Sequence, residues 1–549
     1  MKMKMKKNLA VIIILLISLS CDDHFMDRTP FDSLSSSIIW DSDEYAEMAV
    51  NGVYHTFSQT FWPSFFHYVT NIGPTGYTLI RTGDGINHYS GLSTPNDGKF
   101  LATYRDLYRV ITYSNDIILN VPNNPNITPA FGEQLVGEAK FHRGLSYFYL
   151  WRLYGGVIIL KEPLPIEETY LPRNSADEVK QLIIDDFTDA INKLPVSYDS
   201  SDDGRVTKGA AIAMLGKTYL YDNQWSNASE QFAKLLISPF EYKLTDEFSD
   251  HFFAETEVNS ETVFDLQYIG VQGYGSMMDN RYGYRNHPPI YGEDYSTASN
   301  ISVEIYTNID GTPIDRSGMP NRNDYTNESE YGVDLMNWYQ TAFLNADPRL
   351  HKSIILPGSD FNSADGIQRL YWPTGSANDN PPGIRTTWPS DATLPIRKMV
   401  SEGNVATINH NAPLNWPMIR YADVLLMYAE AKNEESGPTS EVYDAMNTVR
   451  NRVSLAVLPS GLSKDEMRTN IRLERFRELA FETTEYFDVI RWRTAHTDDP
   501  IFGLNHDILD FRYVSKLGEK KFREDRDYLW PIPQGEIDIN PLIEQNPNW

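Results

Sequence analysis

The chain has 549 residues, of which 41% are hydrophobic and 22% are charged, a composition typical of a globular protein with a large core. Its formal net charge of −27 argues against nucleic-acid binding, which needs a basic surface, and against charge-driven attachment to anionic lipid. No stretch after residue 20 is apolar enough to span a bilayer.

The first 21 residues predict export and attachment to a membrane by lipid. A lysine-rich start precedes an apolar run at 9–19, which has the length found in signal peptides, and the only cysteine, Cys21, follows. This arrangement resembles a bacterial lipoprotein signal, which implies removal of residues 1–20 and acylation of Cys21. The alternative is an ordinary secretory signal that leaves a free thiol. We favour the lipoprotein because a lone exposed thiol is reactive.

Helices are predicted in two blocks, after an extended tether at 21–39. In the first block, Ser42 is a plausible cap for a helix whose buried stripe ends near Phe57. Ser175 and Glu178 have capping-box spacing at the start of a later helix. The predicted helices are 101–119, 132–153 and 176–194 in the first block, and a pair within 420–452, then 465–481 and 487–492, in the second.

Residues 208–240 have the spacing of a tetratricopeptide repeat. Gly216 allows close approach of a partner helix, on which Ala228 and Phe232 pack. A single repeat cannot bury both of its faces, so the neighbouring helix pairs must stack on it. The sequence therefore predicts a mostly α fold in which tetratricopeptide-like helix pairs form a scaffold.

Two stretches, 61–99 and 270–418, lack helical periodicity and are rich in glycine and proline. Only short strands are predicted near them, at 263–269, 353–356 and 396–399. The chain as a whole contains 33 Tyr, 25 Phe and 11 Trp, and several of these lie in the two loop-rich stretches. A flat aromatic face with a polar edge suits a sugar ring, and long loops often carry function.

Several motifs, in their order and spacing, resemble the SusD/RagB family of nutrient-binding outer-membrane lipoproteins from Bacteroidetes-type bacteria. The motifs are EAKFHRGLSYF at 138–148, GRVTKGAA at 204–211, IRYADVLLMYAEA at 419–431, NTVRNR at 447–452, ERFRELAFE at 474–482 and a Pro-Ile-Pro tail from 531 through Gln545-Asn546. Gly144 stands where the family usually has Ala. After the Phe-Glu pair, Thr483 and the two residues that follow it replace the Gly-x-Arg that is usual in the family. Both departures fall in predicted scaffold helices.

The resemblance implies one SusD-like domain at 40–549, with a helical scaffold at 40–262 and 419–549 and a ligand-loop region at 263–418. It further implies a lipid-anchored protein exposed on the cell surface at the outer membrane. Such a protein captures a nutrient, most often an oligosaccharide, and delivers it to a SusC-like TonB-dependent transporter. Asp22 and Asp23 also resemble the acidic signal that sends such lipoproteins to the surface.

Candidate ligand-binding residues come from the two loop-rich stretches. In the family the loop after the first helix lines the site, and the residues that offer a charged donor, an acceptor, an amide and a ring there are Arg81, Asp84, Asn87 and Tyr89. A second group of aromatic residues comprises Tyr282, Tyr284, Trp338 and Trp372. No cofactor or metal is predicted: 199–204 is only superficially like a calcium loop, and we interpret it as a helix entry capped by Thr207.

We predict no enzymatic activity. With 75 acidic residues, carboxylate pairs are unavoidable and do not indicate a glycosidase. Glu474, Arg475, Glu478 and Glu482 are interpreted as a salt-bridged structural face, with Arg450 or Arg491 as partners. The alternatives left open are a surface glycoside hydrolase, a peptide-binding member of the family, and a helical scaffold that binds only protein.

Overall fold

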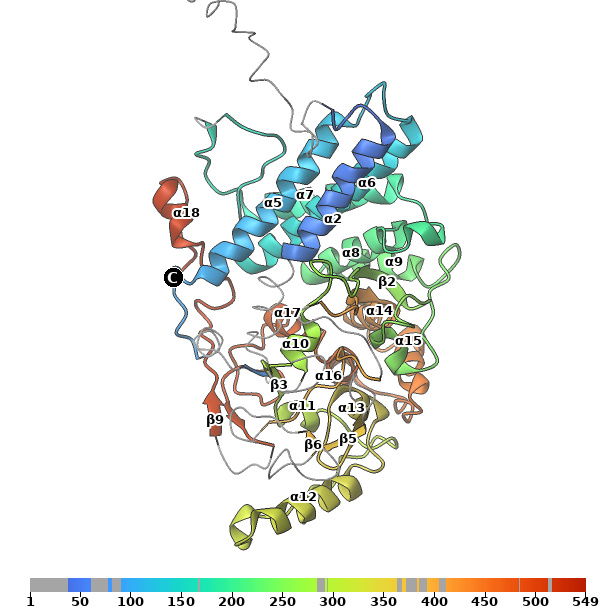
Figure 1. Cartoon of the computed structure of the whole chain (residues 1–549), viewed down its shortest axis with the longest axis vertical. Helices are drawn as coiled ribbons and strands as arrows, with labels where there is room; N and C mark the ends of the chain where they lie inside the picture. Colours follow the sequence, from blue (N-terminus) through green and yellow to red (C-terminus); the bar gives the residue numbers. More distant parts are fainter. Residues whose placement is uncertain are drawn as a thin grey trace, which may run out of the picture.

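The computed structural model describes residues 38–60, 78–80, 90–165, 168–283, 292–293, 295–362, 368–371, 383–384, 393–403, 411–482, 484–511 and 516–549. In this part of the chain, a group of long helices fills one end of an elongated molecule, while most of the short helices and strands lie toward the other end, which α12 (Glu328–Ala342) closes (Figure 1). None of the helices within these ranges is long and apolar enough to cross a membrane.

Four long helices pack side by side at the helical end (Figure 1). The backbone N–H of Tyr45 donates to Ser42 Oγ, and the capping box of Ser175 with Glu178 is present, so both predicted helix starts are confirmed. Gly155, at φ +77°, ends the third helix of the group. The four helices are α2 (Asp43–Gln59), α5 (Gly98–Asn120), α6 (Pro129–Tyr154) and α7 (Ala176–Lys193).

The predicted tetratricopeptide-like pair is confirmed as α8 (Lys208–Tyr221) and α9 (Trp225–Lys234). A Cβ on Gly216 would lie 2.7 Å from the ring of Phe232, so only glycine permits this approach. Thr207 caps α8, because its hydroxyl accepts from the backbone N–H of Ala210 at 3.2 Å.

The stack of helices joins segments that are far apart in the sequence, because α9 packs against α14 (Tyr421–Ser436). Leu425 on α14 and Met446 and Val449 on α15 (Ser440–Arg452) share a buried cluster, as the sequence predicts. The scaffold ends with α16 (Lys464–Glu478), α17 (Thr484–Arg491) and α18 (Gln534–Ile539).

The described strands are short and form four small sheets. The predicted strand near 263 is confirmed as β2 (Thr262–Leu266), which pairs antiparallel with a strand that the sequence analysis missed, β7 (Trp416–Arg420). The remaining strands are β1 (Thr78–Ile80) with β3 (Ser296–Ala298), β4 (Asp360–Asn362) with β5 (Gln368–Tyr371) and β6 (Gly383–Ile384), and β8 (Asp507–Leu509) with β9 (Lys516–Glu519).

The predicted strands at 353–356 and 396–399 pair with each other, but only through an isolated antiparallel bridge between Ile354 and Ile396. The first is shortened at Ser353, where a helix that was not predicted ends. Asp347 caps this helix, α13 (Pro348–Ser353), and Pro348 at its first position favours that start. The other helices are the short η3 (Ser200–Asp202), η4 (Phe248–Phe252), α10 (Met278–Tyr282), α11 (Ile301–Glu304) and η5 (Arg322–Asp324), and the longer α12 (Glu328–Ala342).

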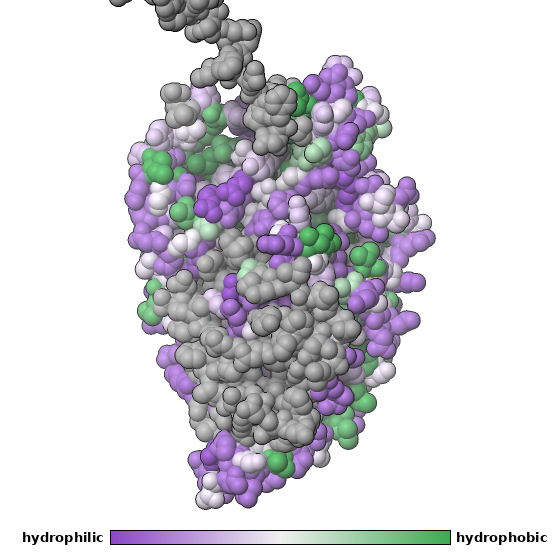
Figure 2. Space-filling model, in the orientation of Figure 1, coloured by the Kyte–Doolittle hydropathy of each residue, from purple (hydrophilic) through white to green (hydrophobic). Residues whose placement is uncertain are grey.

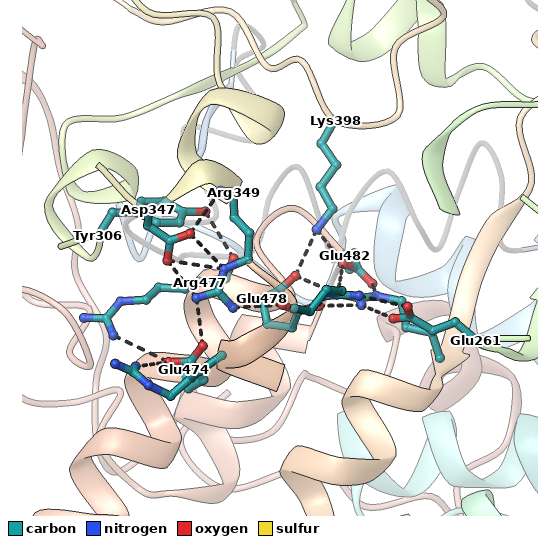
Figure 3. Close-up of polar contacts among 12 residues, drawn as sticks. Glu261, Tyr306, Asp347, Arg349, Lys398, Glu474, Arg477, Glu478 and Glu482 are labelled. Atoms are coloured by element: carbon teal, nitrogen blue, oxygen red, sulfur yellow. Dashed lines mark hydrogen bonds and ion pairs between the residues drawn. The ribbon is translucent and has the colours of Figure 1, made fainter. Parts of the chain in front are cut away.

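A buried ionic network surrounds α16, as Figure 3 shows. Glu478 accepts from Arg349 Nη1 at 2.8 Å, from Arg420 Nη1 at 2.6 Å and from Arg452. Glu482 accepts from Lys398 Nζ at 2.5 Å, and Arg420 also bonds to Glu482. Because Arg349 and Lys398 come from the loop-rich region, the network fastens that region to the helical scaffold.

The predicted salt bridge between Glu474 and Arg450 is confirmed at 2.8 Å. Arg491 instead pairs with Glu430 and Asp488. The network lies in the core rather than on a surface, since Glu474 and Glu478 are fully buried. The surrounding arginines hold the pKa of the Glu478 carboxyl well below its usual range despite its burial.

Candidate ligand-binding site

The predicted site residues fall mostly outside the described residues. This holds for Cys21, for the group Arg81, Asp84, Asn87 and Tyr89, and for Tyr284 and Trp372. Two of the predicted aromatic residues, Tyr282 and Trp338, can be placed.

Tyr282 and Trp338 lie in different parts of the molecule. Tyr282 is only 2% exposed at the end of α10, so its ring is part of the core. Trp338 is on α12, which forms the lower end of the molecule in Figure 1. Its Nε1 donates to the Ser317 carbonyl at 3.2 Å, and its ring packs edge-on against Tyr339. The structure therefore does not bring these two residues into one site.

A pocket of about 470 Å³ lies at the C-terminal end of α2, directly before the first loop-rich stretch. We call it the α2 pocket. Its volume is in the range of ligand sites. Its lining includes Asn51, His55, Ser58, Gln59, Gln267 and Tyr274.

The α2 side of the pocket comes from the helix face opposite its core stripe. Ala46, Val50, Val53 and Phe57 are buried, so the polar residues spaced between them turn outward. The rings of His55 and Tyr274 have centroids 5.9 Å apart and planes inclined by 50°. Tyr274 is 58% exposed and thus presents an accessible aromatic face.

The other side of the pocket holds an oriented amide. Gln267 Oε1 accepts from Asn415 Nδ2 at 3.0 Å. Asn415 is itself fixed, because its Oδ1 accepts from the backbone N–H of Tyr268 and its own N–H donates to Glu257 Oε2 at 2.7 Å. Gln267 is exposed, and its Nε2 makes no hydrogen bond within the described part of the chain. This amide is therefore held ready to donate to a ligand.

The acidic residues near the α2 pocket are withdrawn from its surface. Both carboxylate oxygens of Asp265 are buried, and one lies 3.5 Å from His251 Nε2. Glu257 is also buried, and its burial raises the pKa of its carboxyl to about 8. The pocket thus offers an imidazole, amides, hydroxyls and a ring, which suit binding of a polar, uncharged molecule.

The loop at 199–204 is a helix entry, as predicted. Its Asp202 carboxylate accepts from Arg205 Nε at 2.8 Å, and Thr207 caps the following helix. In the ranges that the structure describes, no group of three His, Cys, Asp or Glu side chains is arranged to hold a metal ion.

His55 and Gln267 were missed by sequence reasoning. The signal for His55 was present, since Asn51, His55 and Ser58 recur at helical spacing on the polar face of an amphipathic helix. Gln267 carried no such signal, because its role depends on Asn415, which is distant in sequence.

The second half of the chain matches a family model. Residues 260–549, more than half of the chain, match the model described as the SusD family. The chain belongs to the SusD family. A second model, described as "Starch-binding associating with outer membrane", matches residues 24–220 of this SusD-family chain.

Relatives of this SusD-family chain extend over nearly its whole length. SusD-like protein P38 of Formosa agariphila is 24% identical over 99% of both chains. A SusD-like carbohydrate binding protein from Bacteroides fragilis has a TM-score of 0.77 at 24% identity, covering 92% of this chain and 100% of that chain. Surface glycan-binding protein A from Bacteroides thetaiotaomicron, solved with laminarihexaose, has a TM-score of 0.67 at 18% identity over 92% and 99%.

Proposed function

We propose that this protein binds an oligosaccharide at the bacterial cell surface and releases it chemically unchanged. The observation that carries the proposal is the α2 pocket, where an exposed ring and an oriented amide face solvent while the nearby carboxylates are buried. Sugar rings stack on aromatic faces, and their hydroxyls pair with amides and imidazoles. The membership of this chain in the SusD family and the glycan bound in one structural relative support this choice of ligand class.

The burial of the carboxylates near the α2 pocket argues against the alternative that this protein is a surface glycoside hydrolase. Such enzymes place two carboxyl groups on either side of the scissile bond. Asp265 and Glu257 lie below the surface of the α2 pocket, and Glu474, Glu478 and Glu482 are neutralised by arginine and lysine within the core.

Affinity gel electrophoresis tests the proposal. Soluble polysaccharides, including laminarin and starch along with mannans, xylans and galactans, are cast into native gels, and retardation of the protein reports binding. We expect at least one of them to retard the protein and the variant Tyr274→Ala to lose most of that retardation. Tyr113→Ala is the matched control, because Tyr113 is an exposed tyrosine on α5 outside the pocket. Failure of every polysaccharide would contradict the proposal.

The proposed role includes a membrane anchor and a partner. Cys21 would carry the acyl chains, and a SusC-like TonB-dependent transporter would receive the ligand at the outer membrane. The outer membrane named in the second family description supports this location. Cys21→Ala should release the protein in soluble form to the periplasm. Retention of that variant on the cell surface would show that another feature anchors the chain.

The sequence-based ligand residues remain part of this proposal. Arg81, Asp84, Asn87 and Tyr89 follow α2 in the chain, and the lining of the α2 pocket begins on α2 itself with Asn51 and His55. We expect alanine at Arg81 or Tyr89 to weaken retention of the same polysaccharide. A peptide ligand would instead give no retardation by any glycan and would be found with a peptide library.

A further inference from the structure

A second cavity adjoins the α2 pocket and is larger, at about 640 Å³. We call it the β2 cavity, because strand β2 forms one of its walls. The opposite side comes from the loop before α8 and from the segment that follows α9. Its lining includes Tyr198, Asp203, Phe240, Glu241, Tyr242 and Val258.

The two cavities meet at shared residues. Gly204, Asp265 and Gln267 line both of them. Gly204 lies at φ +92°, and a Cβ there would be 2.4 Å from Gln267 Cγ, so the side chain of Gln267 rests directly on the glycine backbone. The oriented amide of Gln267 therefore stands at the junction, where it can reach a ligand in either cavity.

The β2 cavity offers aromatic faces as the α2 pocket does. Phe240 and Tyr242 are both partly exposed, with ring planes only 7° apart and centroids separated by 6.0 Å. The Tyr242 hydroxyl lies 3.4 Å from Thr207 Oγ1, which fixes its ring against the start of α8. Tyr198, also partly exposed, donates its hydroxyl to the Val206 carbonyl at 3.1 Å. Three rings thus line this cavity, and the two tyrosines among them are anchored through their hydroxyls.

The charges of the β2 cavity favour an uncharged ligand. Arg205 is the one cation among the described residues of its lining, and it is already paired with Glu47, Glu138 and Asp202, at 2.5 to 3.0 Å. Asp203 and Glu241 are exposed there and leave the cavity with negative charge. An anionic sugar or phosphate would be repelled, whereas hydroxyl groups can pair with the carboxylates.

We propose that the α2 pocket and the β2 cavity form one elongated groove that binds a neutral oligosaccharide in extended form. One end of the ligand stacks near Tyr274, its middle passes the amide of Gln267, and its other end reaches the rings of Phe240 and Tyr242. This inference rests on the proposed function, since it specifies the length and charge of the ligand bound there. A groove of this length predicts that long fragments of the oligosaccharide bind more tightly than short ones.

Calorimetric titration with a short and a long fragment of the polysaccharide that is retained in the gels tests this groove. Tyr242→Ala should weaken binding of the long fragment about tenfold, the loss expected for one stacking contact, and leave the short fragment unchanged. Val258→Trp is a second variant, because Val258 is 54% exposed at the cavity and a larger side chain there fills the space without removing core packing. Val457→Trp, at an exposed valine outside both cavities, is its matched control.

The outcomes separate this inference from the proposed function. Weaker long-fragment binding in Val258→Trp, with unchanged short-fragment binding and one ligand per chain, supports the groove. Unchanged long-fragment binding in Val258→Trp would overturn the single groove and leave the proposed glycan binding intact. A stoichiometry of two long fragments per chain would have the same meaning. If the wild type binds no polysaccharide, the proposed function fails and the inference fails with it.

Discussion

The ionic network around α16 and the groove beside α2 use polar residues in opposite ways. In the network, Glu478 is fully buried and accepts from three arginines, so its charge is compensated inside the protein. In the groove, Gln267 and Tyr274 are exposed and keep hydrogen-bonding capacity or an aromatic face directed to solvent. Hydrophilic side chains cover much of the described surface in Figure 2, with smaller hydrophobic patches between them.

This difference shows where function is to be sought in an acidic chain. Charged residues that cluster at helical spacing, such as Glu474 and Glu478, hold separate segments together inside the core. Neutral polar and aromatic residues at the ends of the scaffold elements face solvent instead. Substitutions in the two regions should therefore differ in whether they change stability or binding.

Glu478→Gln should cause the largest loss of stability. The substitution keeps the shape of the side chain but leaves Arg349, Arg420 and Arg452 with an uncompensated buried charge, which costs about 3–5 kcal/mol in the free energy of unfolding. Urea unfolding followed by circular dichroism measures this loss. The control Glu133→Gln breaks a more exposed pair with Lys193 and should cost about 1 kcal/mol or less. Equal losses in the two variants would contradict the structural role of the network.

Glu257→Gln should change how stability depends on pH. The folded protein raises the pKa of Glu257 to about 8 through burial, so it binds this proton more tightly than the unfolded chain does. The contribution of Glu257 to the free energy of unfolding should therefore be fully present below about pH 4. It should fall as pH rises toward 8, with a slope of at most about 1.4 kcal/mol per pH unit.

The Glu257→Gln variant should lack this contribution and lose less stability than the wild type between pH 5 and pH 8. Thermal unfolding midpoints across that range provide the measurement. Glu485 and Asp279, whose pKa values burial raises to about 7 and about 6, should contribute a slope of the same sign in both proteins. Parallel curves for variant and wild type would refute the assignment to Glu257.

Tyr274→Ala should separate binding from stability. Because Tyr274 is exposed, its removal should change the free energy of unfolding by only about 0.5 kcal/mol, as is usual for surface sites. Glycan affinity should nevertheless fall about tenfold, equivalent to about 1.4 kcal/mol. Titration calorimetry and urea unfolding of the same preparation give both quantities. A variant that loses stability but keeps its affinity would place Tyr274 in the core and not in the site.

Gln267→Ala should have the smallest effect. It removes one amide donor, whose net contribution to binding is about 0.5–1.5 kcal/mol, and spares the aromatic faces. Affinity for short and long fragments should fall to a similar extent, because Gln267 lines both cavities. An effect confined to one fragment length would place the amide within a single cavity.

The sequence predicted the scaffold well because its signals are local. Capping at Ser42 and Ser175, and the approach of Phe232 to Gly216, depend on residues close together in the chain. The strand β7 was missed because its pairing with β2 joins segments about 150 residues apart, and the helix α13, which Asp347 caps, takes Ser353 from the strand predicted at 353–356.

The candidate site was harder to predict than the scaffold for the same reason. The α2 pocket combines His55 from a helix with Tyr274 and Gln267 from near a distant strand, and Gln267 depends on Asn415 for its orientation. Aromatic composition alone also singled out Tyr282, whose ring is almost entirely inside the core. Burial, which the loop sequence does not reveal, distinguishes it from Tyr274.

The central claim is that the groove holds a glycan without cutting it. The most direct measurement incubates the purified protein with the polysaccharide that retards it and follows both retention in the gel and the number of reducing ends. We expect retention with no increase in reducing ends over prolonged incubation. New reducing ends that disappear in Asp203→Asn, Glu241→Gln, Asp265→Asn or Glu257→Gln would contradict the claim and identify the protein as a hydrolase.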